Sequence, residues 1–225
     1  MLSYDSPVPA GTNGHTNGHR DASSITTDHN GSMASIRPRK QTTKHHHIWL
    51  VTGPAGSGKT TVAEFLADKL HLPYIEGDAL HTKANVEKMR NGTPLNDADR
   101  WDWLTLLRDE STRQIASGSE GVVVTCSALK RKYRDVIRVA AYFDPLIRVH
   151  FIFLDASEDE LLRRVAERKG HYMGANMVRS QFDILERPGA DEGDVISVDV
   201  GRSPGEVAED ALSRVHKIIS SDRSY

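Results

Sequence analysis

The nine residues from Gly53 to Thr61, GPAGSGKTT, constrain the fold of this chain more than any other stretch. They fit the pattern G-x-x-x-x-G-K-[ST], follow the apolar run IWLVT directly, and open a segment with apolar residues at helical spacing. In this context the glycines let backbone N–H groups surround phosphate oxygens, and the N-terminus of the following helix adds positive potential. A chance Gly-rich turn is the alternative, and a match of four fixed positions between a strand and a helix argues against it.

The motif assigns a role to each of its members. Lys59 is expected to reach the β- and γ-phosphates of ATP, and the Thr60 hydroxyl is expected to bind Mg²⁺. The expected nucleotide-binding residues are Gly53, Pro54, Ala55, Gly56, Ser57, Gly58, Lys59, Thr60 and Thr61. The motif does not distinguish hydrolysis, a switch and transfer to a small molecule, because these differ in what faces the γ-phosphate.

The rest of the chain alternates between strand-like and helix-like patterns, which is typical of a parallel sheet with helices on its faces. Strands are expected at 47–52, 72–77, 121–128, 147–155 and 194–200, and helices at about 59–70, 82–90, 98–117, 129–141, 157–168, 175–186 and from 203 onward. The sequence therefore predicts an α/β fold with a five-stranded parallel sheet in a single domain, residues 45–222, connected by right-handed crossovers.

The first 44 residues differ in composition from this domain. They are rich in Ser, Thr, Asn, Gly, His and Asp, and include the near-repeat TNGHTNGH, so they are expected to form a disordered polar tail. The triplet His45-His46-His47 could bind a metal, but the sequence favours a polar lead-in to the first strand.

Bulk properties point to a soluble globular protein without nucleic-acid or membrane partners. The net charge is −2, 38% of the residues are apolar, and no apolar run approaches the roughly 20 residues that cross a bilayer. The single cysteine, Cys126, lies in an apolar run, which indicates a buried hydrophobic side chain rather than a nucleophile. Without an internal disulfide or a secretory signal, the cytoplasm is the expected compartment.

The second expected strand ends at Glu76-Gly77-Asp78, close to His81 and Lys83. Ligands of open α/β sheets bind at the carboxyl ends of the strands, so Asp78 is expected to face the same crevice as the phosphate loop. A carboxylate there can accept the proton of an attacking hydroxyl, while His81 and Lys83 offer donors to a polar or anionic substrate. The alternative is that Asp78 caps a helix beginning near Leu80 and that His81 is a surface residue.

The third strand is followed by CSALKRKYR, in which Ser127, Lys130 and Arg134 combine hydroxyl, ammonium and guanidinium donors. Polyhydroxy and carboxylate ligands need such donors, although a basic, solvated helix face is the alternative.

Further along, Arg164 and Arg168 are four residues apart and precede Gly170, as arginines of a mobile lid would. Ordinary exposed helix arginines are the alternative for this pair. Asp155 at the end of FIFLD resembles a Mg²⁺-binding aspartate, but it also lies just before the helix cap Ser157, and the sequence favours that local role.

Together these segments resemble the gluconokinase family, small P-loop kinases that phosphorylate the 6-hydroxyl of D-gluconate with ATP. The resemblance rests on GPAGSGKTT, EGDALHTKANVEKMRNGTPLNDADRWDWL, CSALKRKYR, RVAERKGHYM and SQFDILERP, and extends from about Ile48 to Val200. It implies a three-layer P-loop kinase fold similar to shikimate and nucleoside-monophosphate kinases, with a helical substrate-binding region near 80–104 and a short lid near 164–176.

By the same resemblance, Asp78 orients and deprotonates the acceptor hydroxyl, and Arg164 and Arg168 are lid arginines. The implied gluconate contacts are Asp78, His81, Lys83, Ser127, Lys130, Arg134 and Gln181. The implied catalytic residues are Lys59, Asp78, Arg164 and Arg168, with ATP and Mg²⁺ as cofactors and Thr60 as the metal ligand.

Two positions depart from related patterns. Glu76 stands where shikimate kinases carry the first Asp of an Asp-x-Asp pair, which counts against shikimate as substrate and leaves the outer metal ligands open. Lys83 stands where the family often has arginine, which would weaken bidentate carboxylate recognition. Three alternatives to gluconate phosphorylation remain: phosphorylation of another small acceptor, a P-loop ATPase or switch, and a function that resides in the tail. The sequence leaves the oligomeric state open, and a homodimer is one of the possibilities.

Overall fold

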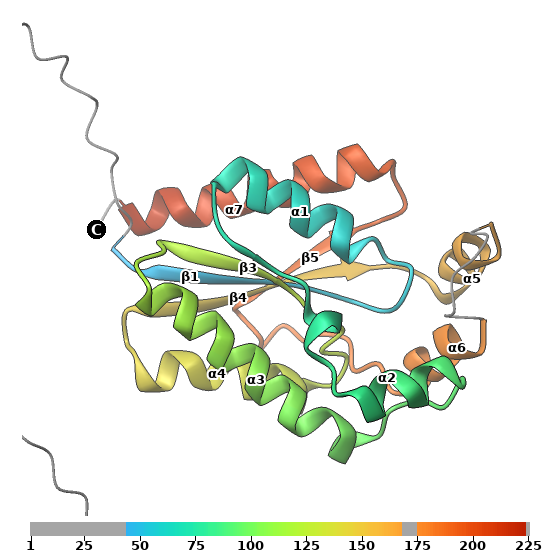
Figure 1. Ribbon diagram of the computed structural model, residues 1–225. Helices are drawn as coiled ribbons and strands as arrows, with labels where there is room; N and C mark the ends of the chain where they lie inside the picture. The colour runs from blue at the N-terminus through green and yellow to red at the C-terminus, as the bar shows by residue number, and fades with distance from the viewer. Residues whose placement is uncertain (1–43, 168–174, 224–225) are drawn as a thin grey trace, which may run out of the picture. The chain divides into compact units, whose positions relative to one another are not determined.

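The computed structural model describes residues 44–167 and 175–223. Within these residues five parallel strands form one sheet with the order β2-β3-β1-β4-β5 (Figure 1). The strands are β1 (His46–Thr52), β2 (Tyr74–Ile75), β3 (Gly121–Thr125), β4 (Ile147–Asp155) and β5 (Val195–Asp199). The predicted five-stranded parallel sheet is confirmed, although β2 and β3 are shorter than the expected strands at 72–77 and 121–128.

Helices cover both faces of this sheet (Figure 1). The helical segments are α1 (Lys59–Leu70), the short 3₁₀ helix η1 (Gly77–Leu80), α2 (Lys83–Arg90), α3 (Asp97–Ala116), α4 (Arg131–Phe143), α5 (Glu158–Glu167), α6 (Ala175–Asp183) and α7 (Pro204–Arg223). α1 and α7 pack on one face and α3 and α4 on the other, while α2, α5 and α6 lie near the carboxyl ends of the strands (Figure 1). This is the predicted three-layer arrangement.

Local sequence sets several of the helix starts. Asn96 caps α3 in a capping box with Asp99, because the Asn96 side chain accepts from the Asp99 N–H and the Asp99 side chain accepts from the Asn96 N–H. Thr82 caps α2 by accepting from the Asn85 N–H. Ser203 and Glu206 exchange the same pair of bonds at the start of α7. Each of these starts lies within one or two residues of its expected position.

The central strands are apolar on both faces and fill two separate cores. Trp49 and Val51 of β1 point toward α1 and α7, whereas Ile48 and Leu50 point toward α3 and α4. All four side chains are fully buried, as expected for a parallel strand covered by helices on both sides.

β1 begins one residue earlier than expected, so His46 of the expected polar lead-in lies in the strand. His46 and His47 belong to β1, and the ring of His47 stacks on Trp49, which stacks on His150 of β4 with ring centroids 4.4 Å apart. His45 pairs with Asp222 of α7. Among the described residues no group of three or more His, Cys, Asp or Glu side chains is placed to hold a metal ion.

No helix in the described part of the chain is long and apolar enough to cross a membrane. The tail predicted for residues 1–44 lies outside the described residues, except for Lys44.

The histidine stack makes stability depend on pH. Burial lowers the pKa of His150 to about 4, and the neighbouring His47 adds to the shift. An unfolded chain binds a proton there near pH 6.5, so stability is full above that pH and is lost as the pH falls toward 4. We expect this residue to remove about 2 kcal/mol of unfolding free energy between pH 7 and pH 5.

Denaturant unfolding of His150→Gln at both pH values tests this expectation. The variant should lose less stability on acidification than the wild type, and His216→Gln, which changes an exposed histidine of α7, should behave like the wild type. Equal pH dependence of all three proteins would contradict the account.

Candidate active site

The phosphate loop lies between β1 and α1, as its sequence predicts. Gly58 precedes α1 with φ of 97°, a left-handed conformation that favours glycine. Lys59 donates from Nζ to the carbonyl of Pro54 at 3.0 Å, across the loop. Burial lowers the pKa of Lys59, and the carboxylates of Asp78 and Glu76 partly offset this effect. A half-buried ammonium beside a concave loop of N–H groups is suited to bind phosphate.

Glu76 connects the phosphate loop to the end of β2. Its Oε2 accepts from Thr60 Oγ1 at 3.2 Å and from the Tyr74 hydroxyl at 2.5 Å, and its Oε1 accepts from Thr125 Oγ1 at 2.5 Å. Burial raises the pKa of Glu76, but these three hydrogen bonds, together with one from the Asp78 backbone, outweigh it and lower the pKa overall. An ionised carboxylate beside the Thr60 hydroxyl is a set of hard oxygen donors, which fits Mg²⁺.

The backbone of Gly77 fixes the position of Asp78. A side chain at Gly77 would place its Cβ 1.9 Å from the carbonyl oxygen of Thr125, so only glycine fits there. The Gly77 N–H donates to Thr125 Oγ1 at 3.0 Å, and Trp103 Nε1 donates to the Gly77 carbonyl at 2.7 Å. Asp78 itself lies inside η1 and caps no helix, because Thr82 caps α2.

Six of the predicted site residues line one narrow cleft of about 40 Å³. They are Ala55, Lys59, Asp78, His81, Ser127 and Gln181. Gln181 also touches the phosphate loop, because its Oε1 accepts from the Ala55 N–H at 2.7 Å. The structure thus brings residues from β1–α1, η1, the loop after β3 and α6 to one place, which a transfer between two bound molecules requires.

His81 stands in this cleft as a neutral imidazole. Its ring stacks on Trp103 with centroids 4.0 Å apart, and its Nε2 lies 3.9 Å from Asp78 Oδ1. Burial lowers the pKa of His81, partly offset by Asp78. The buried Nδ1 has no hydrogen-bond partner among the described residues, so it is available to a bound hydroxyl.

Arg100 of α3 also lines the cleft, and the sequence reasoning missed it. Only its Nη1 donates within the described part of the chain, to the carbonyl of Leu95 and to the Tyr133 hydroxyl at 3.5 Å. Its position in the sequence could have identified it, because its spacing places it with Trp103, Leu104 and Leu107 on the buried face of α3. A charged residue on an apolar helical stripe is uncommon unless it has a partner or a ligand.

Three predicted substrate contacts lie elsewhere. Lys83 is exposed in the first turn of α2, and Lys130 pairs with Asp97 at 3.0 Å; neither lines the cleft. Arg134 is 1% exposed and its guanidinium is occupied by Glu192 and by backbone carbonyls. Its position on the buried face of α4, rather than on the basic exposed face, keeps it from contacting a ligand in the cleft.

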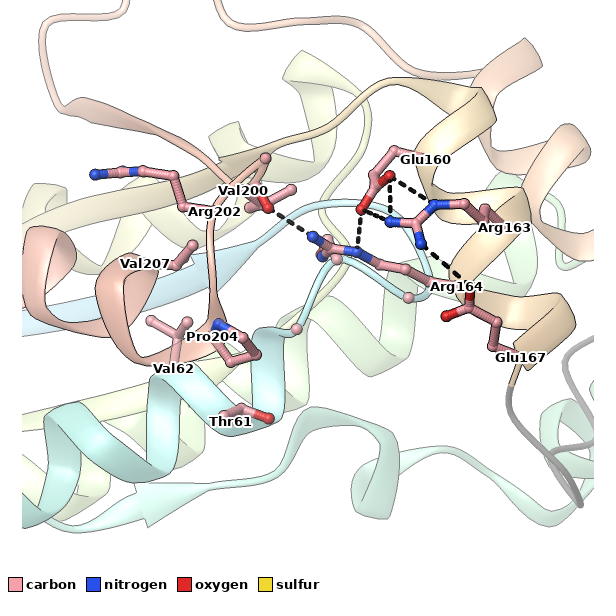
Figure 2. A pocket seen from close by; sticks show the side chains of 14 residues that line it. Thr61, Val62, Glu160, Arg163, Arg164, Glu167, Val200, Arg202, Pro204 and Val207 are labelled. Carbon is pink, nitrogen blue, oxygen red and sulfur yellow. Dashed lines mark hydrogen bonds and ion pairs between the residues drawn. The ribbon is translucent and has the colours of Figure 1, made fainter.

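A second cavity of about 390 Å³ adjoins the phosphate loop on the side of α5 and α7 (Figure 2). Gly56, Ser57, Gly58 and Thr61 form one wall, and Val200, Arg202 and Pro204 another. Arg164 projects into the space between them, where it donates to Glu160 Oε1 at 2.7 Å and to the Val200 carbonyl at 2.6 Å (Figure 2). Arg168 lies outside the described residues.

Asp155 has an arginine partner at the end of β4. Its carboxylate pairs with Arg187, whose Nη2 also donates to the Ala156 carbonyl at 3.1 Å. This pair is a structural contact of the kind that the sequence favours for Asp155.

Comparisons with known proteins place the chain among small kinases. A family model described as an AAA domain matches residues 48–187. The chain is 47% identical over 193 residues to a probable gluconokinase of Schizosaccharomyces pombe, covering 85% of this chain and 98% of that protein. The chain belongs to the gluconokinase family. Membership in the family confirms the resemblance that the motifs between Gly53 and Pro188 predict.

Other members support the same conclusion. The thermoresistant gluconokinase of Escherichia coli is 42% identical over 160 residues, covering 71% of this chain and 88% of that protein. A crystal structure of a gluconokinase from Sinorhizobium meliloti 1021 has a TM-score of 0.68 and 38% identity, covering 80% of this chain and 96% of that chain. The chain therefore resembles members of the family both in sequence and in fold.

Proposed function

We propose that this protein transfers the γ-phosphoryl group of ATP to the 6-hydroxyl of D-gluconate, forming 6-phosphogluconate. The observation that carries the proposal is that Lys59 of the phosphate loop and Asp78 of η1 line the same cleft. The Asp78 side chain is 58% exposed and caps no helix, so its carboxylate is free to meet a ligand. Relatives named gluconokinase, at 42% to 47% identity, support this choice of substrate.

Asp78 accepts the proton of the attacking hydroxyl in this mechanism. As that proton moves to the carboxylate, the 6-oxygen bonds to the γ-phosphorus and the bond from phosphorus to the β,γ-bridging oxygen breaks, leaving ADP. Lys59 lies close enough to Asp78 for the carboxylate to offset part of the lowering of the Lys59 pKa by burial, so the ammonium can interact with charge on the transferred group. The cleft is narrow, so gluconate binding requires its side chains to move apart.

The nucleotide occupies the other side of the phosphate loop. The cavity beside Gly56 and Thr61 combines apolar walls, Val62 and Val207, with the guanidinium groups of Arg163 and Arg164, which suits a flat base and its phosphates. Thr60 and Glu76 would hold Mg²⁺, which neutralises phosphate charge when bound. The role of Arg168 as a lid arginine remains part of the proposal.

Arg100 is the residue that we assign to the carboxylate of gluconate. Lys59 and Arg100 are the permanent cations among the described residues that line the cleft, and Lys59 is committed to the phosphate loop. Arg100 still has the N–H groups on Nε and Nη2 for a bidentate bond to a carboxylate. Neutral His81 and the Ser127 hydroxyl are left for the hydroxyl groups of the acid.

Substituting Asp78 by Asn should stop phosphoryl transfer without preventing ATP binding. The amide keeps the shape of the side chain but cannot accept the proton, so turnover should fall by about 10²- to 10⁴-fold. Gluconate-dependent ADP release and the ATP dissociation constant measure the two effects.

Asp68→Asn serves as the matched control, because Asp68 is an exposed carboxylate near the far end of α1, 76% accessible. This variant should keep wild-type turnover. Near-normal turnover by the Asp78 variant would contradict the assignment of Asp78 as base.

Substituting Arg100 by Gln should weaken gluconate binding and leave ATP binding unchanged. Loss of a charge-assisted bidentate bond is expected to raise KM for gluconate about tenfold or more, while KM for ATP stays within about twofold. Steady-state kinetics with each substrate varied in turn measure both constants. A proportional rise in both KM values, or no rise for gluconate, would contradict the assignment.

A further inference from the structure

The buried ion pair between Arg134 and Glu192 joins three segments that are distant in sequence. Arg134 Nε donates to Glu192 Oε2 at 2.8 Å and Nη2 donates to Oε1 at 2.6 Å, a two-pronged contact. The side chains are 1% and 3% exposed. Hydrogen bonds from Arg134 lower the pKa of Glu192 to about 2, so the carboxylate is ionised at neutral pH.

The third nitrogen of the guanidinium holds backbone. Arg134 Nη1 lies 3.2 Å from the carbonyl of Ala128, 3.4 Å from that of Leu129 and 3.1 Å from that of Glu186. Ala128 and Leu129 form the loop after β3, and Glu186 follows α6. One buried side chain therefore ties the loop after β3, the end of α6 and the segment before β5 together.

These segments carry substrate-facing residues. Ser127, immediately before Ala128, lines the cleft, and its carbonyl accepts from Thr52 Oγ1 at 2.5 Å and from the Gly53 N–H at 3.4 Å. Gln181 and Met177 of α6 line the same cleft. Ala128 has a φ of 37°, a left-handed conformation that is uncommon for a residue with a Cβ, so the loop needs external bonds to keep this shape.

We propose that Arg134 and Glu192 act as positioning residues for the gluconate site, by fixing the loop that presents Ser127 relative to α6 and the phosphate loop. The inference rests on the proposed function. Neither residue touches the cleft, and their effect on the reaction passes through the backbone of Ala128, Leu129 and Glu186. Geometric errors of about 1 Å at a bound substrate can cost on the order of 10²-fold in rate.

Arg134→Lys tests the proposal directly. Lysine keeps a cation for Glu192, but a single ammonium cannot reach the two carboxylate oxygens and three carbonyls that the planar guanidinium serves. We expect KM for gluconate to rise about tenfold, with KM for ATP changing by less than about threefold. A role in stability alone would lower the melting temperature and leave the KM of the folded protein unchanged.

Arg138→Lys is the matched control. Arg138 lies one turn further along α4 and bonds the same Glu192 at 2.6 Å, together with Asp194 and Asp135. It bonds no backbone carbonyl of the loop after β3 within the described residues. The control should lose stability and keep the wild-type KM for gluconate.

A double variant, Arg134→Met with Glu192→Leu, separates folding from positioning. Apolar replacement of a buried ion pair is often neutral for stability, so this variant should fold even if Arg134→Lys does not, and it should still show the raised KM for gluconate. Three outcomes would overturn the positioning role. They are a wild-type KM for gluconate in the folded double variant, equal changes of this KM in Arg134→Lys and Arg138→Lys, and failure of both Arg134 variants to fold. Wild-type protein that does not turn over gluconate would overturn the proposed function, and this inference with it, before any variant is made.

Discussion

Parallel pairing of β1 and β2 with β3 places Lys59, Asp78 and Ser127 at one edge of the sheet. Because the three strands run in the same direction, the chain segments that leave them meet at one edge of the sheet. β1 continues into the phosphate loop, β2 into Glu76 and Asp78, and β3 into Ser127. The register places Val51 beside Thr125 and Ile75 beside Val124, so the three exits are level with one another. A donor site and an acceptor site next to each other follow from this register.

At this edge of the sheet, the backbone of Thr125 lies too close to Gly77 for residue 77 to carry a side chain. The Thr125 carbonyl approaches Gly77 so closely that no other residue fits there, while the Thr125 hydroxyl bonds both the Gly77 N–H and Glu76. Trp103 closes the arrangement from α3 by bonding the Gly77 carbonyl. Asp78 thus projects from backbone that is fixed on three sides, which reduces the ordering that substrate binding must supply. The same apolar face of α3 brings Arg100 into the cleft.

Local sequence signals predicted the sheet, the phosphate loop and Asp78, because each depends on residues close together in the chain. Alternating strand and helix patterns define the layers, and the strand that ends just before Asp78 places this residue at the carboxyl edge of the sheet. Arg134 could not be placed in the same way: its partner Glu192 is 58 residues away, and a basic residue in a basic helix suggests a solvated face. The acidic residues Asp99 and Asp102 near Arg100 suggest an exposed, charged part of the helix. Its spacing from Trp103 and Leu107 instead indicates that it faces inward.

The central claim is that the γ-phosphoryl group passes to gluconate rather than to water or another acceptor. Its most direct test is a coupled assay of ADP release by the full chain with D-gluconate, shikimate, AMP or no acceptor. The account predicts rapid ADP release with gluconate alone and a product that is 6-phosphogluconate. ADP release that is equally fast without an acceptor, or fast only with shikimate or AMP, would contradict it.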